Sequence, residues 1–223
     1  MGHKYRRAIE LQKKWASMFQ RVPLQGPIKL VGGGDVAFSR DGKWCVGAIM
    51  TLTFPGLEEQ ERAFAWERVT FPYIPGLLSF REAPVLIKAA RKLSKQPDVL
   101  IVDGQGLAHP RRFGLACHVG VRLNWPTIGC AKSRLIGTHR PVGVSKGCRC
   151  KLIDQQEVIG SVVRSRAEVK CIYVSEGHRV ELEQAVKFVL RCCGRYRLPE
   201  PIRSAHNMVT KLRLNRTAET IDR

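Results

Sequence analysis

Hydrophobic and polar positions divide the first part of the chain into one helix and three strands. Over 4–20, hydrophobic residues recur every three or four positions, which predicts an amphipathic helix. Three hydrophobic stretches follow, and Asp-Gly and Pro-Gly turn signals separate them. These stretches cover 28–38, 44–54 and 61–70. Consecutive strands joined by tight turns predict an antiparallel meander.

Strands and helices alternate in the rest of the chain. Ser79 and Glu82 have the spacing of a capping box, which predicts a helix that runs to about Ser94. The stretch 99–103 is continuously hydrophobic until Asp103, as expected of a strand that is buried on both faces. Further helices are predicted over 112–123, 181–193 and 203–212, strands over 127–131, 159–164 and 169–175, and a long basic loop over 133–157. This order predicts an α/β domain with a mixed sheet.

The composition is that of a folded chain and not of a disordered or membrane-embedded one. Of the 223 residues, 44% are hydrophobic and 26% are charged, which is ordinary globular usage. The length suits a single domain over 1–223, with about ten frayed residues at the C-terminus. No hydrophobic run approaches the roughly 20 residues of a membrane span. Because the basic N-terminus leads into an amphipathic stretch and not into a signal peptide, we expect a cytoplasmic protein.

The charge of the chain is strongly positive and unevenly distributed. Basic residues outnumber acidic ones by 38 to 19, so the formal net charge is +19. The stretch 104–153 contains no acidic residue, and its basic residues are Arg111, Arg112, Arg122, Lys132, Arg134, Arg140, Lys146, Arg149 and Lys151. This surplus predicts a polyanionic partner, with nucleic acid favoured over a membrane surface. A solvated basic face, as in a ribosomal protein, stays open as an alternative.

The eight cysteines are expected to be free thiols. Without a secretory signal, a disulfide framework is not expected. The close pairs Cys148/Cys150 and Cys192/Cys193 lack the C-x-x-C spacing that suits zinc. A structural metal held by cysteines is therefore the less favoured alternative.

Three acidic residues stand where a mixed sheet would bring them together. Asp35 follows three glycines within a predicted strand, Asp103 ends the buried strand, and Glu82 lies at the start of a helix. Carboxylates at the ends of hydrophobic strands are costly unless they are paired or bind a cation, and ligands gather at the carboxyl ends of strands in α/β sheets. Together the three acids predict a Mg²⁺ or Mn²⁺ site that activates water for attack on a phosphate. Taken singly, each would rather be interpreted as a cap, a turn or an ion-pair residue.

Other residues near these acids suggest contacts to a phosphorylated ligand. His109 comes six residues after Asp103, and a catalytic and a structural role are equally open for it. Lys132, after a predicted strand, could reach a phosphoryl oxygen or simply be solvated. The aromatic, proline-stiffened loop 71–76 could insert between bases, or it could be a turn packed on the core. The glycines at 32–34 lack the patterns of nucleotide-binding loops.

Longer motifs resemble one family over nearly the whole chain. They are PYIPGLLSFRE at 72–82, VDGQGLAHPR at 102–111, GLACH at 114–118, PTIGCAK at 126–132, GHRV at 177–180 and YRLPEP at 196–201. In combination they resemble endonuclease V, the deoxyinosine 3′-endonuclease family. The resemblance implies an RNase H-like mixed sheet, with three antiparallel strands followed by parallel strand–helix units and flanked by helices. It also implies a Mg²⁺-dependent DNA repair endonuclease, with Mn²⁺ as a substitute for Mg²⁺.

The resemblance also implies site residues, by position in these motifs. The metal-binding and catalytic acids would be Asp35, Glu82 and Asp103. Lys132 and His109 match residues near the scissile phosphate, and His206 falls near the metal site. The wedge that separates the strands would be Tyr73, Ile74, Pro75 and Gly76. The pocket for the flipped hypoxanthine would be formed by Gly76, Leu78, Gly104 and Gly106. The phosphate contacts would come from Arg111, Arg112 and Arg134. Cleavage is expected at the second phosphodiester bond 3′ to the lesion, by a metal-activated water, which leaves a 3′-hydroxyl and a 5′-phosphate.

The chain departs from the family pattern at three positions. Gln105 stands where His or Asn is commoner, Gly34 where Val or Ala is commoner, and Arg195 where Gly is commoner. None of these changes removes a catalytic group, but Gln105 could alter the range of lesions. The expected partner is DNA that contains deoxyinosine or another deaminated base, bound by a monomer. Inosine-containing RNA stays open. Further alternatives are a resolvase-type RNase H-like nuclease, a module that binds inosine without cutting, and a basic structural protein.

Overall fold

The computed structural model describes residues 2–215, and the tail expected over about the last ten residues lies almost wholly outside this range. The strands are β1 (Leu30–Phe38), β2 (Trp44–Thr53), β3 (Glu59–Arg68), β4 (Val99–Val102), β5 (Thr127–Ala131), β6 (Arg149–Asp154), β7 (Glu157–Val163) and β8 (Ile172–His178). The helices are α1 (Gly2–Ala16), α2 (Ser79–Ala90), α3 (Leu115–Leu123), α4 (Leu182–Arg191) and α5 (Glu200–Leu214). None of these helices is long and hydrophobic enough to cross a membrane.

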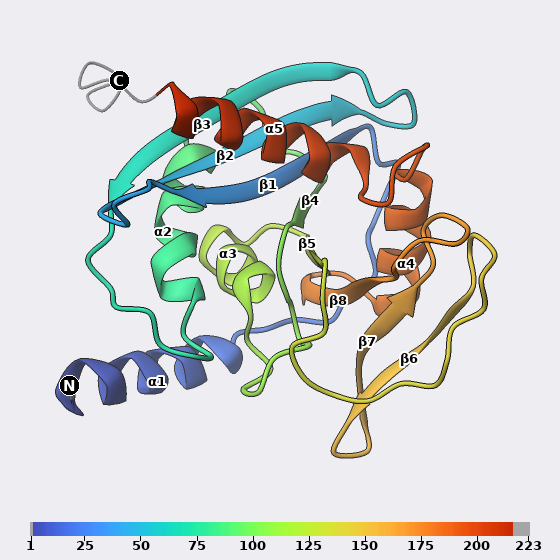
Figure 1. Ribbon diagram of the computed structural model, residues 1–223, viewed down its shortest axis with the longest axis horizontal. Helices are drawn as coiled ribbons and strands as arrows, with labels where there is room; N and C mark the ends of the chain where they lie inside the picture. The colour runs from blue at the N-terminus through green and yellow to red at the C-terminus, as the bar shows by residue number, and fades with distance from the viewer. Residues whose placement is uncertain (1, 216–223) are drawn as a thin grey trace.

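The strands form one mixed sheet with the order β3-β2-β1-β4-β5-β8-β7-β6 (Figure 1). The first three strands form the predicted antiparallel meander. At the centre of the sheet, β1, β4 and β5 run parallel, and α3 connects β4 to β5. The remaining strands, β8, β7 and β6, continue the sheet in antiparallel pairs. Parallel pairing is thus confined to the three central strands, whose carboxyl ends share one edge.

The prediction of an unbroken loop over 133–157 is wrong, because β6 lies inside it. β6 pairs with β7 and forms one edge of the sheet. Leu152 is the single buried residue of this strand, and the alternation of polar and hydrophobic residues covers only 149–152, which is too short a stretch to predict a strand by itself. Pairing with β7, and not burial of its own side chains, makes β6 extended.

Several helix starts differ from the prediction, and α3 begins at Leu115 rather than at 112. The N-cap of α2 is Leu78, and no side chain caps this helix, so the expected capping box does not form. The hydroxyl of Ser79 instead lies 3.2 Å from Nδ1 of the buried His118. α5 begins at Glu200, before the expected 203, because Pro201 fits the first turn of a helix.

Helices cover both faces of the sheet (Figure 1): α4 and α5 pack on one face, and α2 and α3 pack on the other. β4 shows the division. Val99 and Ile101 belong to the core beneath α4 and α5, whereas Leu100 and Val102 belong to the core beneath α2 and α3. These residues are fully buried, which confirms the prediction of a strand covered on both faces. Each such side chain stabilises the fold by roughly 1.5–3 kcal/mol relative to an exposed one.

Gly33 allows α5 to lie directly on β1. A Cβ atom at this position would lie 2.0 Å from the main-chain carbonyl of Pro201, so no side chain fits there. Glycine in a strand is typical of a place where another backbone or a ligand approaches closely, and here the backbone of α5 does so. The close approach carries His206, further along α5, to the side chain of Asp35 on β1.

The cysteines are all free thiols, as expected. Five of them are buried: Cys45, Cys117, Cys130, Cys192 and Cys193. Burial raises the pKa of Cys45 to about 12 and that of Cys192 to about 12. These thiols therefore stay protonated and act as small hydrophobic side chains of the core.

Candidate active site

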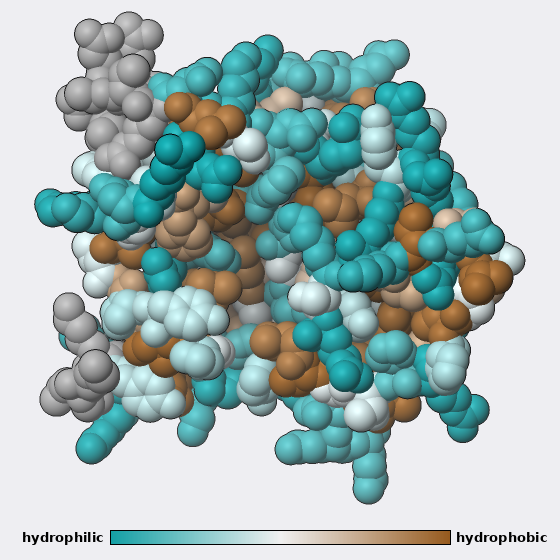
Figure 2. Space-filling model, viewed as in Figure 1, coloured by the Kyte–Doolittle hydropathy of each residue, from teal (hydrophilic) through white to brown (hydrophobic). Residues whose placement is uncertain are grey.

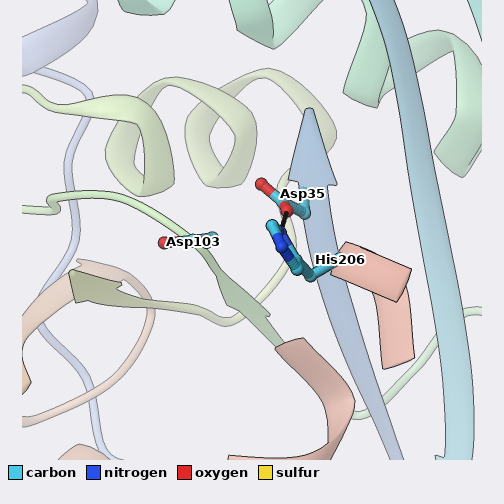
Figure 3. A group of neighbouring side chains, drawn as sticks. All are labelled: Asp35, Asp103 and His206. Carbon is cyan, nitrogen blue, oxygen red and sulfur yellow. Dashed lines mark hydrogen bonds and ion pairs between the residues drawn. The ribbon is translucent and has the colours of Figure 1, made fainter. Parts of the chain in front are cut away.

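Asp35, Asp103 and His206 form a compact group that could hold a metal ion (Figure 3). One potential ligand atom from each residue lies within 4.8 Å of the others. Asp35 lies on β1, Asp103 follows β4, and His206 lies on α5. The parallel pairing of β1 with β4 continues through a hydrogen bond from the N–H of Asp103 to the carbonyl of Gly34 (2.9 Å). The neighbouring strands thus set the two carboxylates side by side, as predicted for acids at this edge of the sheet.

Asp35 is the most enclosed member of this group and is 7% exposed. Nδ1 of His206 donates a hydrogen bond to Oδ2 (2.7 Å), and the N–H of Val36 donates to Oδ1 (2.8 Å). An ionised carboxylate only accepts hydrogen bonds, so the proton of His206 sits on Nδ1. Burial, and next the charge of Asp103, raise the pKa of Asp35 although both hydrogen bonds oppose the rise.

Glu82, on α2, completes the acidic neighbourhood. It lies outside the three-residue group, but it lines the same cavity as Asp103. Burial above all, and then the charges of Asp35 and Asp103, raise the pKa of Glu82 to about 8. Such a rise shows that the carboxylates repel one another in a poorly hydrated space. A divalent cation would relieve this repulsion, and the oxygen-rich donor set suits a hard cation such as Mg²⁺ or Mn²⁺.

Lys132 follows β5 and contacts the same group. Its Nζ lies 2.5 Å from Oδ2 of Asp103. The main chain of Lys132 is held by Arg197, whose Nη2 donates to the carbonyl of Lys132 (2.5 Å) and to that of Cys171 (2.8 Å). Arg197 belongs to the YRLPEP motif, but the sequence does not indicate its contact with Lys132. The YRLPEP motif therefore marks Arg197 as a residue of interest, but only the fold shows that Arg197 positions Lys132.

A cavity of about 400 Å³ opens beside Asp103 and Glu82. Most of the residues that the sequence assigns to the wedge, the base pocket and the phosphate contacts meet there. They are Tyr73, Ile74, Pro75, Gly76, Leu78, Gly104, His109, Lys132 and Arg134. Sequence reasoning did not assign Ser79, Gly114, Leu115, Ala131, Ser133 and Leu135, which also line it. Gly106, which was also expected in the base pocket, is not among the described residues that line the cavity, and a Cβ atom there would collide with the main-chain carbonyl of Glu176.

The loop that carries Tyr73 projects from one wall of this cavity. The side chain of Tyr73 is 68% exposed. At the end of the loop, Gly76 has a φ of +75°, in the left-handed region that favours glycine. The carbonyl of Gly76 accepts hydrogen bonds from Arg111 and from Nε2 of Gln12 (3.2 Å). An exposed aromatic residue thus stands on a loop whose far end is fixed.

Gln12, on α1, is fully buried and was not identified from the sequence. Its Nε2 also donates to the carbonyl of Phe113 (3.0 Å), and its Oε1 accepts a hydrogen bond from Arg111. Gln12, Arg111, Gly76 and Phe113 therefore form one network across three segments of the chain. We call this network the loop brace. A buried glutamine on an amphipathic helix was the available signal, because such a side chain needs partners.

The three arginines that were expected at phosphates lie in different surroundings. Arg111 belongs to the loop brace. Arg112 makes ion pairs with Asp154 (2.9 Å) and Glu157 (2.6 Å), so its charge is locally neutralised. Arg134 is exposed and lines the cavity. Of the three, Arg134 has the most open approach to a bound strand.

His109 is buried in the wall of the cavity and is neutral. Burial, and then the charge of Arg111, lower its pKa to about 4. Its Nδ1 lies 3.2 Å from the N–H of Arg111, which donates to it. The described residues do not place His109 in the group that could hold a metal ion. Its position suits contact with a ligand in the cavity.

The family model of Endonuclease V matches residues 10–207. This chain belongs to the Endonuclease V family. An Endonuclease V of Roseiflexus sp. is 49% identical over 191 residues, which cover 86% of this chain and 85% of that protein. An Endonuclease V of Gloeobacter violaceus is 49% identical over 203 residues, which cover 90% of this chain and 82% of the relative. Membership of the Endonuclease V family makes the chain an enzyme that hydrolyses phosphodiester bonds.

Solved Endonuclease V structures share the whole fold. The Endonuclease V of Streptomyces avermitilis has a TM-score of 0.89 and 35% identity, and the match covers 92% of this chain and 91% of that one. The Endonuclease V of Ciona intestinalis, in complex with a 23mer DNA that contains an inosine followed by a ribo-adenosine, has a TM-score of 0.85 and 29% identity and covers 96% of this chain and 98% of that chain. These matches confirm the expected RNase H-like α/β fold.

Proposed function

We propose that this chain is a DNA repair endonuclease that recognises deoxyinosine and other deaminated bases. It hydrolyses the second phosphodiester bond 3′ to the lesion and leaves a 3′-hydroxyl and a 5′-phosphate. The observation that carries the proposal is the position of the group Asp35, Asp103 and His206 beside the cavity. A base held in this cavity would leave the adjoining phosphates of its own strand within reach of the acids.

Asp35, Asp103 and His206, with Glu82 nearby, are the residues that would hold the metal ion, which we propose to be Mg²⁺, with Mn²⁺ as a substitute. A bound ion would neutralise charge that develops on the phosphate and would lower the pKa of an attacking water. Lys132 would contact a non-bridging phosphate oxygen, since its ammonium group already lies at Asp103. His206 holds Asp35 in one orientation through its Nδ1–H.

The exposed ring of Tyr73 supports a wedge role in opening the duplex. An enzyme that acts at a damaged base gains from extruding that base, and a weak pair costs least to open. The volume of the cavity and its main-chain groups around Gly76 and Gly104 suit a flat base such as hypoxanthine. Ile74 and Pro75 stiffen the loop, so that Tyr73 can take the place of the extruded base.

The test uses an end-labelled duplex with one deoxyinosine and a matched duplex with adenine at that place. Each is incubated with the protein in Mg²⁺ and in EDTA. We expect a nick at the second phosphodiester bond 3′ to the lesion, in Mg²⁺ and in the inosine duplex alone. Inosine-selective binding without a nick would instead assign a binding module. Neither cutting nor selectivity would contradict both functions, and preference for a branched duplex would favour a resolvase-type nuclease.

The finer parts of the proposal have their own tests. We propose that DNA is the substrate, that the chain acts as a monomer formed by a single domain, and that it works in the cytoplasm. A single-stranded inosine RNA of equal sequence tests the first point, and faster cutting of this RNA would assign an RNA nuclease. Elution of the active protein at the volume of a dimer would contradict the second point.

A further inference from the structure

Two arginines lie over the ring of Tyr196, close to the start of α5. The guanidinium carbon of Arg203 is 4.1 Å from the ring centroid, and that of Arg195 is 4.9 Å from it. Tyr196 is 37% exposed, and Arg195 is exposed as well. Contacts of this kind hold guanidinium groups against an aromatic ring with little loss of hydration. We call Arg195, Tyr196 and Arg203 the arginine–tyrosine cluster.

One hydrogen bond and one helical spacing place this cluster near the candidate active site. Arg197, the next residue after Tyr196, donates to the carbonyl of Lys132. Arg203 precedes His206 by three residues on α5, so the two side chains share one face of the helix. The segment that carries the cluster thus runs from Arg197, which holds the main chain of Lys132, to His206, which pairs with Asp35.

The positions of the surrounding groups indicate on which side of the scissile bond the cluster lies. Asp103 and Lys132 line the cavity, whereas Asp35, His206 and the cluster do not appear among the described residues that line it. Figure 3 shows Asp103 on one side and the Asp35–His206 pair on the other. Asp103 therefore adjoins the cavity, the Asp35–His206 pair lies outside the cavity lining, and Arg203 lies three residues before His206 on α5. A strand whose lesion lies in the cavity and whose cut lies at the acids continues toward the cluster on its 3′ side.

We propose that the arginine–tyrosine cluster binds the phosphodiester backbone of the cleaved strand on the 3′ side of the scissile bond. This inference rests on the proposed function. Glu200 accepts two hydrogen bonds from Arg203 (3.0 and 2.6 Å), so it orients that guanidinium group and neutralises part of its charge. Arg195 carries the more available charge. Guanidinium groups bind phosphate through several N–H donors in a fixed plane, which suits a backbone contact without base selectivity.

A strand that has been cut would be held by its new 5′-phosphate end as well as by its lesion. The cluster therefore extends the interface beyond the cavity, and it contributes through charge.

The salt dependence of binding tests the proposal directly. The quantity measured is the slope of the logarithm of the binding constant against log [salt], with an inosine duplex in EDTA. For Arg195→Gln we expect this negative slope to become shallower by about 0.9, the value for one lost phosphate contact. The double variant Arg195→Gln/Arg203→Gln should lose up to about twice as much. Tyr196→Phe should keep the wild-type slope because the ring stays, whereas Tyr196→Leu should make it shallower. The control is Arg91→Gln, which removes an exposed arginine at the C-cap of α2, about 13 Å along the helix from Glu82.

A length series then tests the side. In duplexes that end one nucleotide 3′ to the scissile bond, wild type and Arg195→Gln should bind equally, and the difference should return as the 3′ side is lengthened. Equal slopes for wild type and Arg195→Gln on the long duplex would overturn the proposal, as would a fall of the same size for Arg91→Gln. A difference that persists on the short duplex would overturn the assigned side. These measurements require no cleavage, so a failure of the proposed function would be seen separately in the nicking assay.

Discussion

Asp35 combines three influences that rarely meet at one carboxylate. It is buried, it faces the charge of Asp103, and it accepts two hydrogen bonds, one of them from His206. The first two disfavour the charged form and the last stabilises it. A bound cation would favour the charged form of this carboxylate, as the two hydrogen bonds already do.

The first prediction concerns Asp35→Ala. The change removes one candidate metal ligand and leaves the basic surface and the cavity in place. A metal ion supplies several kcal/mol of transition-state stabilisation, so nicking should fall by at least about 1,000-fold. The dissociation constant for an inosine duplex in EDTA should stay within about threefold of the wild-type value. Cutting at the wild-type rate by a pure preparation would contradict the role of Asp35.

Arg197 illustrates a residue that acts through another. Its two hydrogen bonds fix the main chain of Lys132, and the ammonium group of Lys132 then lies at Asp103. We predict that Arg197→Ala lowers the nicking rate by about 10- to 100-fold in the wild-type background. In a Lys132→Ala background the same change should have little further effect, because residues in one network are not additive. Equal losses in both backgrounds would assign Arg197 a general structural role.

At the scale of elements, α1 is tied to the candidate active site by the loop brace. Trp15, also on α1, stacks against Phe80 of α2 and packs on His118 of α3, with ring centroids 5.7 and 4.7 Å away. The polar contacts of Gln12 are different, because two of them reach the ends of loops at Gly76 and Phe113. A helix at the beginning of the chain thus determines where the loop of Tyr73 stands.

We therefore predict that Gln12→Leu weakens discrimination between inosine and adenine. Leucine is similar in size but can neither donate to Gly76 nor accept from Arg111, so Arg111 alone would hold the carbonyl of Gly76 and the loop of Tyr73 should be held less firmly. The ratio of kcat/KM for the two duplexes should fall several-fold, in the same direction as for Tyr73→Ala, and the double variant should resemble Tyr73→Ala alone. Lys13→Ala, an exposed neighbour on α1, is the control. If Gln12→Leu leaves the ratio of kcat/KM unchanged, the proposed role of the loop brace is wrong. If Tyr73→Ala leaves it unchanged, the proposed wedge role of Tyr73 is wrong.

At the scale of the whole molecule, three buried histidines connect stability to pH. Burial, and then the charge of a nearby arginine, lower the pKa of His118 to about 3 and those of His109 and His178 to about 4. In the unfolded chain each would take up a proton near pH 6.5. The neutral folded forms are therefore fully favoured above that pH, and the stabilisation is lost as the pH falls toward the folded pKa values.

The free energy of unfolding should accordingly decrease below about pH 6.5, by roughly 1 kcal/mol per pH unit for each histidine. His118→Gln should remove about one third of the histidine contribution, which urea unfolding at several pH values would measure. The raised pKa of Glu82 acts in the opposite direction, so the difference between variant and wild type is the informative quantity. His139→Gln, at a half-exposed position, is the control. A variant with the same pH profile as wild type would contradict the prediction.

The whole surface also reflects the composition. Figure 2 shows one face on which hydrophilic side chains predominate and hydrophobic residues lie in separate patches. Among the described residues, the acid-free stretch 104–153 supplies Arg134 and Lys132 to the cavity. Arg112, from the same stretch, is neutralised by ion pairs to Asp154 and Glu157, just outside it. A count of charges therefore predicts the kind of partner but not which charges reach it.

The sequence by itself determined the elements whose pattern is strong. The meander, the strand 99–103 and the alternation of strands and helices follow from hydrophobic periodicity, which is a local property. The same holds for the neighbourhood of Asp35, within β1, and Asp103, directly after β4, because parallel pairing sets these two strands side by side. The longer motifs added the family. These predictions concern residues whose own chemistry, or that of close neighbours in the chain, decides their place.

Only the tertiary structure decided the rest. β6 is a strand because it pairs with β7. The hydroxyl of Ser79 does not cap α2, as was expected, but lies at hydrogen-bond distance from His118. Gln12 meets Gly76 across 64 positions of sequence, and His206 meets Asp35 across 171. Such contacts depend on how whole elements pack, and α5 reaches β1 through the space that Gly33 leaves. The free energy of a buried polar group depends on partners that the local sequence does not contain, so the full packing has to form before those partners are defined.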